Sequence, residues 1–340
     1  MKVMVTGGTG FVGSHTVAEL VHGGHRVRLL VRDAARVPLA LAPFGVDEPE
    51  IIIGDVTDRR TVEQAAQGCD ATIHCGSVYS LDPRAGERIR KTNVLGTDVV
   101  LETAHNLGHD PIVHVSSFVA LIGIKCAVLS PASIPSSPPG AYFSSKAESD
   151  RVARKYQDNG VPVVITYPGS VWGPHDPHLG ESCQMTSSIL HRYWSVTPRG
   201  IVSITDVRDL ARMHLAIMEK GRGPRRYIAP ATNVSIGEII TIIASITGRK
   251  LSTRSVPLWM LLRPVQAMDY LQRALPFRFP INFQAVYCSG LCHTLDDSTT
   301  RQDFGIIPRP LEETLADTIN WMVQGGHLPA RLVGRLVKTG

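Results

Sequence analysis

The sequence of 340 residues lacks the features that mark several classes of protein. Its cysteines form no paired framework, so we expect reduced thiols rather than a disulfide scaffold; they are Cys69, Cys75, Cys126, Cys183, Cys288 and Cys292. No stretch of about 18 residues is free of charged or helix-breaking residues, as a membrane-spanning helix requires. The chain starts in an apolar strand, without the basic and then apolar segments of a signal peptide. We therefore expect a soluble, cytoplasmic protein with no transmembrane segment.

Charge is also scarce and evenly spread. The formal net charge is only +5, and the basic residues are scattered, so we expect no nucleic-acid interface. Cys288, Cys292 and His293 lie close together in sequence, but no second ligand pair follows, and we expect no metal site. No internal repeat or low-complexity segment is present. With 43% apolar residues, the chain can bury a substantial core in one large domain or in two.

The first thirteen residues carry the most informative motif. An apolar run, Lys2 to Val5, leads into Thr6-Gly7-Gly8-Thr9-Gly10-Phe11-Val12-Gly13, and a helical pattern follows. In this strand-turn-helix setting, Gly7 permits a tight turn, and Gly10 lets the backbone approach a pyrophosphate. Gly13 lets the helix pack on the strand. The N–H groups at the start of the helix then face an anion, so the motif predicts a dinucleotide site.

The end of the second strand bears on which dinucleotide is bound. A strand at residues 27–31 is followed by Arg32, Asp33 and, one turn later, Arg36. An acidic residue at this junction binds the ribose 2′-hydroxyl of NAD, whereas an arginine accommodates the 2′-phosphate of NADP. Because a planar guanidinium suits a phosphate, we expect NADP, with NAD held by Asp33 as the alternative.

Apolar strands and helical segments alternate over the next part of the chain. The strands are expected at residues 51–53, 71–74, 112–115 and 163–166, with a long helix at about 84–107 among the helices between them. This alternation predicts an α/β fold with a Rossmann-type doubly wound parallel sheet. Ligands of such sheets bind beyond the carboxyl ends of the strands.

Two of these strand ends carry residues of interest. Asp55 follows the third strand and either meets the adenine ring or only stabilises a turn. Cys75, Gly76 and Ser77 follow the fourth strand, and such small residues suit a place where a cofactor lies against the backbone.

A tyrosine and a lysine share one helix face after the fifth strand. That strand ends at Ser116 and Ser117, and a long loop at 118–140 precedes a helix from Ala141 to about residue 158. Tyr142 and Lys146 then lie one turn apart. The pKa of a free tyrosine is near 10, and an adjacent ammonium lowers it. Tyr142 could therefore pass a proton to a carbonyl oxygen as hydride arrives, while a serine holds that oxygen.

Together these motifs resemble those of extended, or atypical, short-chain dehydrogenases/reductases of the epimerase/dehydratase type. The matching segments are Thr6 to Gly13, Gly54-Asp55-Val56, Thr92-Asn93-Val94, Gly96-Thr97, Val115-Ser116-Ser117, Tyr142 with Lys146, Tyr167-Pro168-Gly169, and Asp206-Val207 with Asp209. The resemblance implies a catalytic set of Ser117, Tyr142 and Lys146, with Ser116 the less favoured serine.

The resemblance also implies cofactor contacts and a division into domains. The expected cofactor contacts are Thr6, Gly7, Thr9, Gly10, Phe11, Val12, Gly13, Arg32, Arg36, Asp55, Val56, Cys75, Gly76, Ser77, Asn93, Val115, Tyr142, Lys146, Tyr167, Pro168, Gly169 and Val171. We expect residues 1–167 to form the dinucleotide-binding domain, to which 201–230 return. Residues 168–200 and 231–340 should form a smaller, mostly helical substrate domain. A homodimer through the helices that carry Asn93 and Tyr142 is common in the family.

The pattern is most similar to the NADP-dependent branch with dihydroflavonol reductase-like and 3β-hydroxysteroid dehydrogenase-like members. Two departures are His74-Cys75-Gly76-Ser77 in place of the usual small-residue motif, and Tyr167 in place of an arginine, which disfavours sugar-nucleotide substrates. We expect interconversion of a carbonyl and an alcohol on a moderately apolar small molecule. The alternatives are an NAD-using sugar-nucleotide epimerase or dehydratase, and a non-catalytic dinucleotide sensor.

Helical patterns recur in the last third of the chain, at residues 236–247, 258–274 and 311–324. In the middle one, Leu258, Leu261, Leu262 and Val265 recur at helical spacing. This segment either packs into the core, roofs an apolar substrate pocket or touches a membrane surface.

Overall fold

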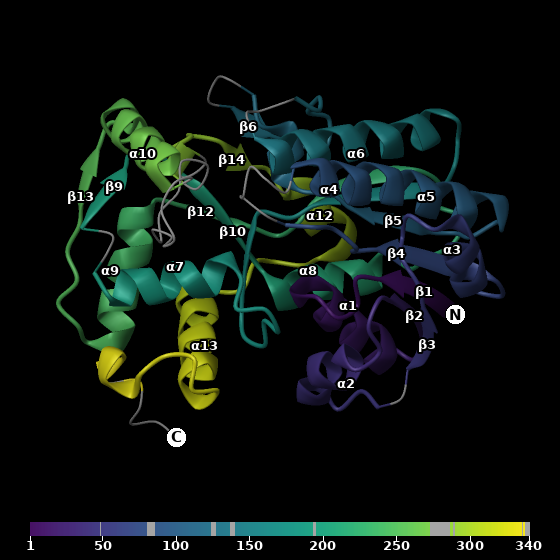
Figure 1. The fold of residues 1–340 in the computed structure, drawn as a ribbon, viewed down its shortest axis with the longest axis horizontal. Coiled ribbons are helices and arrows are strands. Elements are labelled where there is room, and N and C mark those ends of the chain that lie inside the picture. Colours follow the sequence, from purple (N-terminus) through teal and green to yellow (C-terminus); the bar gives the residue numbers. More distant parts are fainter. Residues whose placement is uncertain are drawn as a thin grey trace.

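A computed structural model of the chain describes residues 1–47, 49–79, 86–123, 127–136, 140–192, 195–272, 286–287, 290–334 and 336. Its centre is a seven-stranded sheet in which all neighbouring strands are parallel (Figure 1). In spatial order the strands are β11 (Arg225–Ile228), β7 (Val163–Tyr167), β5 (Ile112–Val115), β4 (Ala71–His74), β1 (Lys2–Thr6), β2 (Arg26–Val31) and β3 (Glu50–Ile53). The order runs outward from β1 in both directions, so the predicted doubly wound sheet is confirmed.

Both faces of this sheet are buried, because successive side chains of a strand point to opposite sides. In β1, Val3 and Val5 pack with Val17 of α1 (Phe11–His22), whereas Met4 packs with Val62 of α3 (Arg59–Ala66). Helix α8 (Val207–Ala216) joins α1 on the first face, and α5 (Gly96–Asn106) and α6 (Ala141–Asp158) join α3 on the second. This burial explains why the strands read as continuous apolar runs.

A second part of the chain has its own apolar core, on the left in Figure 1. Its strands are β8 (Ser170–Trp172), β10 (Val202–Asp206) and β12 (Thr232–Val234) in one sheet, and β9 (Val196–Pro198) with β13 (Arg254–Val256) in another. Its helices are α7 (Glu181–Leu190), α9 (Ile236–Thr247), α10 (Leu258–Gln272) and α13 (Leu311–Gln324). The chain returns from β10 to the large sheet through α8 and β11.

The shorter elements fill in the connections. They are α2 (Arg36–Leu41), α4 (Gly86–Arg90), β6 (Val128–Leu129), β14 (Thr294–Leu295), α12 (Ser298–Phe304), a π-helical segment at Lys91–Leu95, and 3₁₀ turns at Ala42–Phe44, Phe118–Leu121 and Ala330–Leu332. The expected long helix at 84–107 is thus observed from residue 86 to residue 106, with a π-helical segment in its middle.

The long loop at 118–140 has more structure than its sequence suggests. It contains the 3₁₀ turn and β6, and β6 pairs in parallel with β14. His293, next to β14, accepts a hydrogen bond from the Ala127 N–H at 3.2 Å, and its other ring nitrogen lies 3.1 Å from the Gly123 carbonyl. The imidazole considered above as a metal ligand therefore fixes this loop, while Cys288 lies outside the described residues.

A polar joint connects the second part to the sheet. The Asp206 carboxylate, at the start of α8, accepts hydrogen bonds from the Arg208 backbone N–H at 2.8 Å and from Thr314 Oγ1 of α13 at 2.7 Å. Arg208 also pairs with Asp317 of α13 at 2.6 Å. The motif at 206–209 thus fastens α8 to α13.

The described residues include no helix with the length and apolar character needed to cross a membrane. Nor do they include a group of three or more His, Cys, Asp or Glu side chains placed to bind a metal ion.

Candidate functional site

The glycine-rich turn between β1 and α1 is packed so closely that only glycine fits at two positions. Gly7 has a φ of +72°, and a Cβ there would lie 2.7 Å from the Gly76 backbone nitrogen. A Cβ on Gly13 would lie 2.0 Å from the Gly7 carbonyl oxygen. Helix α1 begins after Gly10 with no side-chain cap and no acidic residue in its first turn. Its first N–H groups are therefore available to an anion, and the neighbouring residues Thr9, Gly10, Phe11 and Val12 are partly exposed.

A buried chain of hydrogen bonds holds the end of β4 against this turn. Thr6 Oγ1 accepts from the Gly76 N–H at 3.2 Å and lies 2.7 Å from His74 Nδ1. His74 Nε2 lies 3.3 Å from Thr97 Oγ1. Burial lowers the pKa of His74 to about 3 and raises that of the Cys75 thiol to about 12, so both groups are neutral. Gly76 thus lies directly against Gly7, and the next residue, Ser77, is exposed.

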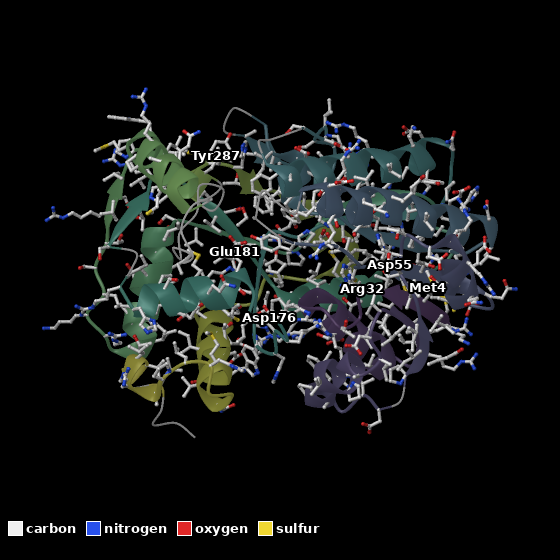
Figure 2. The ribbon with its side chains drawn as sticks, in the orientation of Figure 1. Met4, Arg32, Asp55, Asp176, Glu181 and Tyr287 are labelled. Atoms are coloured by element: carbon white, nitrogen blue, oxygen red, sulfur yellow. The ribbon has the colours of Figure 1, made fainter. Side chains whose placement is uncertain are left out.

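The ends of β2 and β3 adjoin each other, and Figure 2 shows Arg32 and Asp55 there. Arg32 is exposed and forms no ion pair within the described part of the chain. Asp33 lies 3.5 Å from the Arg36 guanidinium and accepts a hydrogen bond from the backbone of its own turn. Asp55 Oδ1 accepts from the N–H and the hydroxyl of Thr57, so at least one of its oxygens stabilises a turn, the second of the two roles considered above.

Val56, the next residue, packs under the start of α5. A Cβ on Gly96 would lie 2.7 Å from Val56 Cγ2. The family motif residue Gly96 thus lets α5 approach this strand end closely.

The two serines after β5 have different surroundings. Ser116 Oγ donates to Asp150 Oδ1 at 3.0 Å, and Asp150 pairs with Arg154 at 2.8 Å. Ser117 Oγ accepts a long hydrogen bond, 3.4 Å, from the Val119 N–H. The Ser116 hydroxyl is therefore used within the core, whereas the Ser117 hydroxyl donates no hydrogen bond to any of the described residues.

Lys146 and Tyr142 lie on α6 beside the same strand end. Lys146 is 6% exposed, and its Nζ donates to the Val115 carbonyl at 3.2 Å. Burial lowers the pKa of this ammonium to about 8. Tyr142, one turn earlier, is partly exposed. A buried ammonium next to a phenol favours the phenolate and makes the phenol more acidic.

Tyr79, which the sequence did not single out, adjoins Tyr142 and links it to a second such residue, Glu181. The Tyr79 ring meets the Tyr142 ring edge to face, with centroids 4.7 Å apart, and the Tyr79 hydroxyl donates to the Glu181 carboxylate. Glu181 begins α7 and lies between the two parts of the molecule in Figure 2. Part of the Glu181 side chain is in contact with solvent. The protein around its carboxyl nevertheless excludes water, and this desolvation raises the pKa of the carboxyl. Tyr79 follows the carboxyl end of β4, and this position could have predicted that it lies at the site. The sequence around Glu181 contains no feature that predicts its place beside Tyr79.

Asn93 acts from within the π-helical segment. Its side chain accepts from the Val78 N–H at 2.7 Å and donates to the Val78 carbonyl at 3.1 Å and to Ser145 Oγ at 3.0 Å. Asn93 thus links the loop after β4 to the helix that carries Tyr142. π-Helical turns are frequent at functional sites.

The segment after β7 is fixed mainly through its backbone. The Pro168 carbonyl accepts from the Phe118 N–H at 3.0 Å, and a Cβ on Gly169 would lie 2.3 Å from the Ser203 carbonyl oxygen. Val171 lies in β8, paired with β10. The Tyr167 ring, by contrast, is fully buried, and its hydroxyl accepts from Arg154 at 2.8 Å. It occupies the core and presents no exposed surface to a ligand.

The structure therefore brings Gly7, Gly76, Ser117, Tyr142 and Lys146 to one edge of the sheet, where the strands end. Such an edge is where doubly wound sheets bind their ligands. The arrangement provides an anion site, a proton donor and a cation.

Known proteins are similar to this chain over nearly its whole length. A protein of Synechocystis sp. described as a candidate dihydroflavonol 4-reductase is 31% identical over 333 residues, covering 95% of each chain. A 4-hydroxy-2-methyl-3-oxo-4-farnesyl-3,4-dihydroquinoline-1-oxide ketoreductase of Stigmatella aurantiaca is 26% identical and covers 94% of this chain and 96% of its own.

Solved structures share the fold. The dTDP-glucose 4,6-dehydratase DesIV of Streptomyces venezuelae, solved with NAD bound, superposes with a TM-score of 0.73 at 24% identity, covering 98% of this chain and all of its own. Residues 3–229 match the sequence profile described as the NAD dependent epimerase/dehydratase family. The chain belongs to this family and is an NAD(P)-dependent enzyme of the extended short-chain dehydrogenase/reductase type.

Proposed function

We propose that the protein is an NADP-dependent oxidoreductase that interconverts a carbonyl and an alcohol on a moderately apolar small molecule, with Ser117, Tyr142 and Lys146 as its proton-transfer set. One observation carries the proposal. The Lys146 ammonium is buried at the end of β5, one helical turn from Tyr142, and β5 leads directly into Ser117. Burying a cation costs free energy unless an opposite charge compensates it. The hydrogen bond of Lys146 is to a neutral carbonyl, so a role in proton transfer accounts for its burial.

Each residue of the set has a separate role. NADPH, when bound, supplies the hydride to the carbonyl carbon. Tyr142 gives its phenolic proton to the carbonyl oxygen, which completes the alcohol, and Lys146 lowers the pKa of that phenol. The Ser117 hydroxyl donates a hydrogen bond to the same oxygen as negative charge develops on it.

The relatives support the reaction and the class of substrate. Both sequence relatives described above are named as reductases, and the ketoreductase is named for a substrate with a farnesyl chain. The second candidate is an NAD-using epimerase or dehydratase of sugar nucleotides, which Asp33 favours because a carboxylate at this junction binds the ribose of NAD. A homodimer and a cytoplasmic location stay predictions.

A cofactor assay distinguishes these functions. The purified protein should oxidise NADPH in the presence of ketones or aldehydes on apolar molecules, with absorbance at 340 nm as the readout. Cofactor released by denaturation should be NADP rather than NAD. Tightly held NAD, with no net oxidation of NADPH by any carbonyl, would instead support the epimerase or dehydratase.

Arg32 should set the preference for NADPH. In Arg32→Ala we expect the KM for NADPH to rise about 10- to 100-fold with the KM for NADH unchanged, because a charge-assisted hydrogen bond is worth about 1.5–3 kcal/mol. Steady-state kinetics with both cofactors measures this. Arg26→Ala is the matched control, since Arg26 is exposed at the opposite end of the same strand. An equal effect on NADH would show that Arg32 does not recognise the 2′-phosphate.

A further inference from the structure

Two segments of the second part of the chain contain no acidic residue, although the exposed Glu238, at the start of α9, lies beside β13. Residues 182–205 and 239–268, which include β9, β13 and the first turns of α10, contain neither Asp nor Glu. The same two segments contain six cations: Arg192, Arg199, Arg249, Lys250, Arg254 and Arg263. All except Arg249 are exposed. A chain with a formal net charge of only +5 thus gathers five exposed cations at one end.

Four of these cations, Arg192, Arg199, Lys250 and Arg254, lie on segments that contact one another. The Arg192 guanidinium donates to the Lys250 carbonyl at 2.8 Å, and Arg254 lies opposite Val196 in the pairing of β9 with β13. The Arg199 N–H donates to the Val256 carbonyl at 2.8 Å. In the part of the chain that the structure describes, no carboxylate pairs with any of the five exposed cations. Figure 2 shows nitrogen-tipped side chains pointing outward from this end.

Large apolar side chains are exposed among the cations. Trp259 is 71% exposed, Met260 47% and Val196 46%. The opposite side of α10 faces the protein. A Cβ added to Gly290 would lie 2.3 Å from Leu258 Cδ1, and Val265 is buried. The outer face of α10 therefore carries Trp259 and, one turn later, Arg263.

We propose that this basic apolar end, formed by β9, β13 and the outer face of α10, binds the surface of a membrane that contains anionic lipid. Anionic head groups complement the five exposed cations, and the head-group boundary accepts an amphipathic Trp ring and the neighbouring Met side chain. A nucleic acid would use the cations but gives no reason to expose Met260 and Val196. Helix α10 lies along the interface and does not cross it. The proposal does not rest on the reaction proposed above.

The test is co-sedimentation of the full chain with vesicles. Binding is expected to mixed phosphatidylcholine and phosphatidylserine vesicles, to weaken as salt is added, and to be absent with phosphatidylcholine alone. The double variant Arg254→Gln/Arg263→Gln should bind about 25-fold more weakly, since each cation near an anionic surface contributes about fivefold. Trp259→Ser should also weaken binding, and the wild-type tryptophan fluorescence should shift to the blue on binding.

Matched controls lie at the other end of the molecule. Arg60→Gln on α3 removes an exposed cation, and Leu39→Ser on α2 removes an apolar side chain that is 77% exposed. Both variants should bind anionic vesicles like the wild type. Unchanged thermal unfolding midpoints would show that all variants fold. Equal binding to neutral vesicles, no binding to anionic ones, or equal losses in the controls would overturn the proposal. Binding to heparin or DNA without binding to vesicles would overturn it in favour of a different polyanion.

Discussion

Replacing Tyr142 with phenylalanine is expected to lower kcat/KM for NADPH-dependent carbonyl reduction by about 10²- to 10⁴-fold, the usual contribution of a positioned general acid. The ring remains, so its edge-to-face contact with Tyr79 at 4.7 Å is kept and only the proton donor is lost. NADPH affinity, measured by fluorescence titration, should therefore stay unchanged.

The matched control is Tyr156→Phe on the same helix. The Tyr156 hydroxyl donates to Asp98 at 3.1 Å, so this variant removes a phenolic hydroxyl elsewhere on α6. It should reduce carbonyls at the wild-type rate. Wild-type turnover in Tyr142→Phe would remove Tyr142 from the mechanism, and loss of NADPH binding would assign its hydroxyl to the cofactor instead.

Acidification from pH 6.5 to pH 4.5 is expected to lower the free energy of unfolding by roughly 6 kcal/mol through His15, His74 and His214, with a further loss through His114. Burial lowers the pKa of His15 to about 4 and those of His74 and His214 to about 3, and it holds the pKa of His114 well below the ordinary value. The unfolded chain therefore takes up protons that the folded chain does not. Stability is complete above about pH 6.5, and each of His15, His74 and His214 removes about 2 kcal/mol by pH 4.5.

Denaturant unfolding at a series of pH values measures this loss. His214 lies between Thr16 Oγ1 at 2.9 Å and Thr166 Oγ1 at 3.3 Å, so His214→Gln keeps a polar group there but cannot titrate. Its loss of stability over this range should be smaller by about 2 kcal/mol. The exposed His22→Gln should behave like the wild type. A free energy of unfolding that does not change between the two pH values would show that these imidazoles are protonated in the fold.

The large sheet was predictable because its signals are local. Parallel strands buried on both faces read as apolar runs, and β4, β5 and β7 lie where such runs were found. The start of α1 follows from its glycine turn. The helices at 236–247 and 311–324 likewise coincide with α9 and α13.

The rest depends on contacts between distant segments. Strands β9 and β13 have three residues each, too few for a pattern, and β10 pairs with β8 and β12 rather than with the large sheet. The contacts of Tyr79 with Tyr142 and Glu181 join three elements that are far apart in sequence. The burial of Tyr167 could not be predicted for the same reason. Its hydroxyl bonds to Arg154, which pairs with Asp150, and both of these residues lie on α6.

The second part of the chain is held at two places, the joint at Asp206 and the Tyr79–Glu181 contact. Several charge-assisted hydrogen bonds connect Asp206, Arg208 and Asp317 there, whereas a single exposed hydrogen bond connects Tyr79 with Glu181. Charge-assisted bonds to partly buried groups are the stronger ones. The contacts of Asp206 and Arg208 with Thr314 and Asp317 therefore hold α13 against the start of α8, while the Tyr79–Glu181 contact holds α7 near the segment after β4.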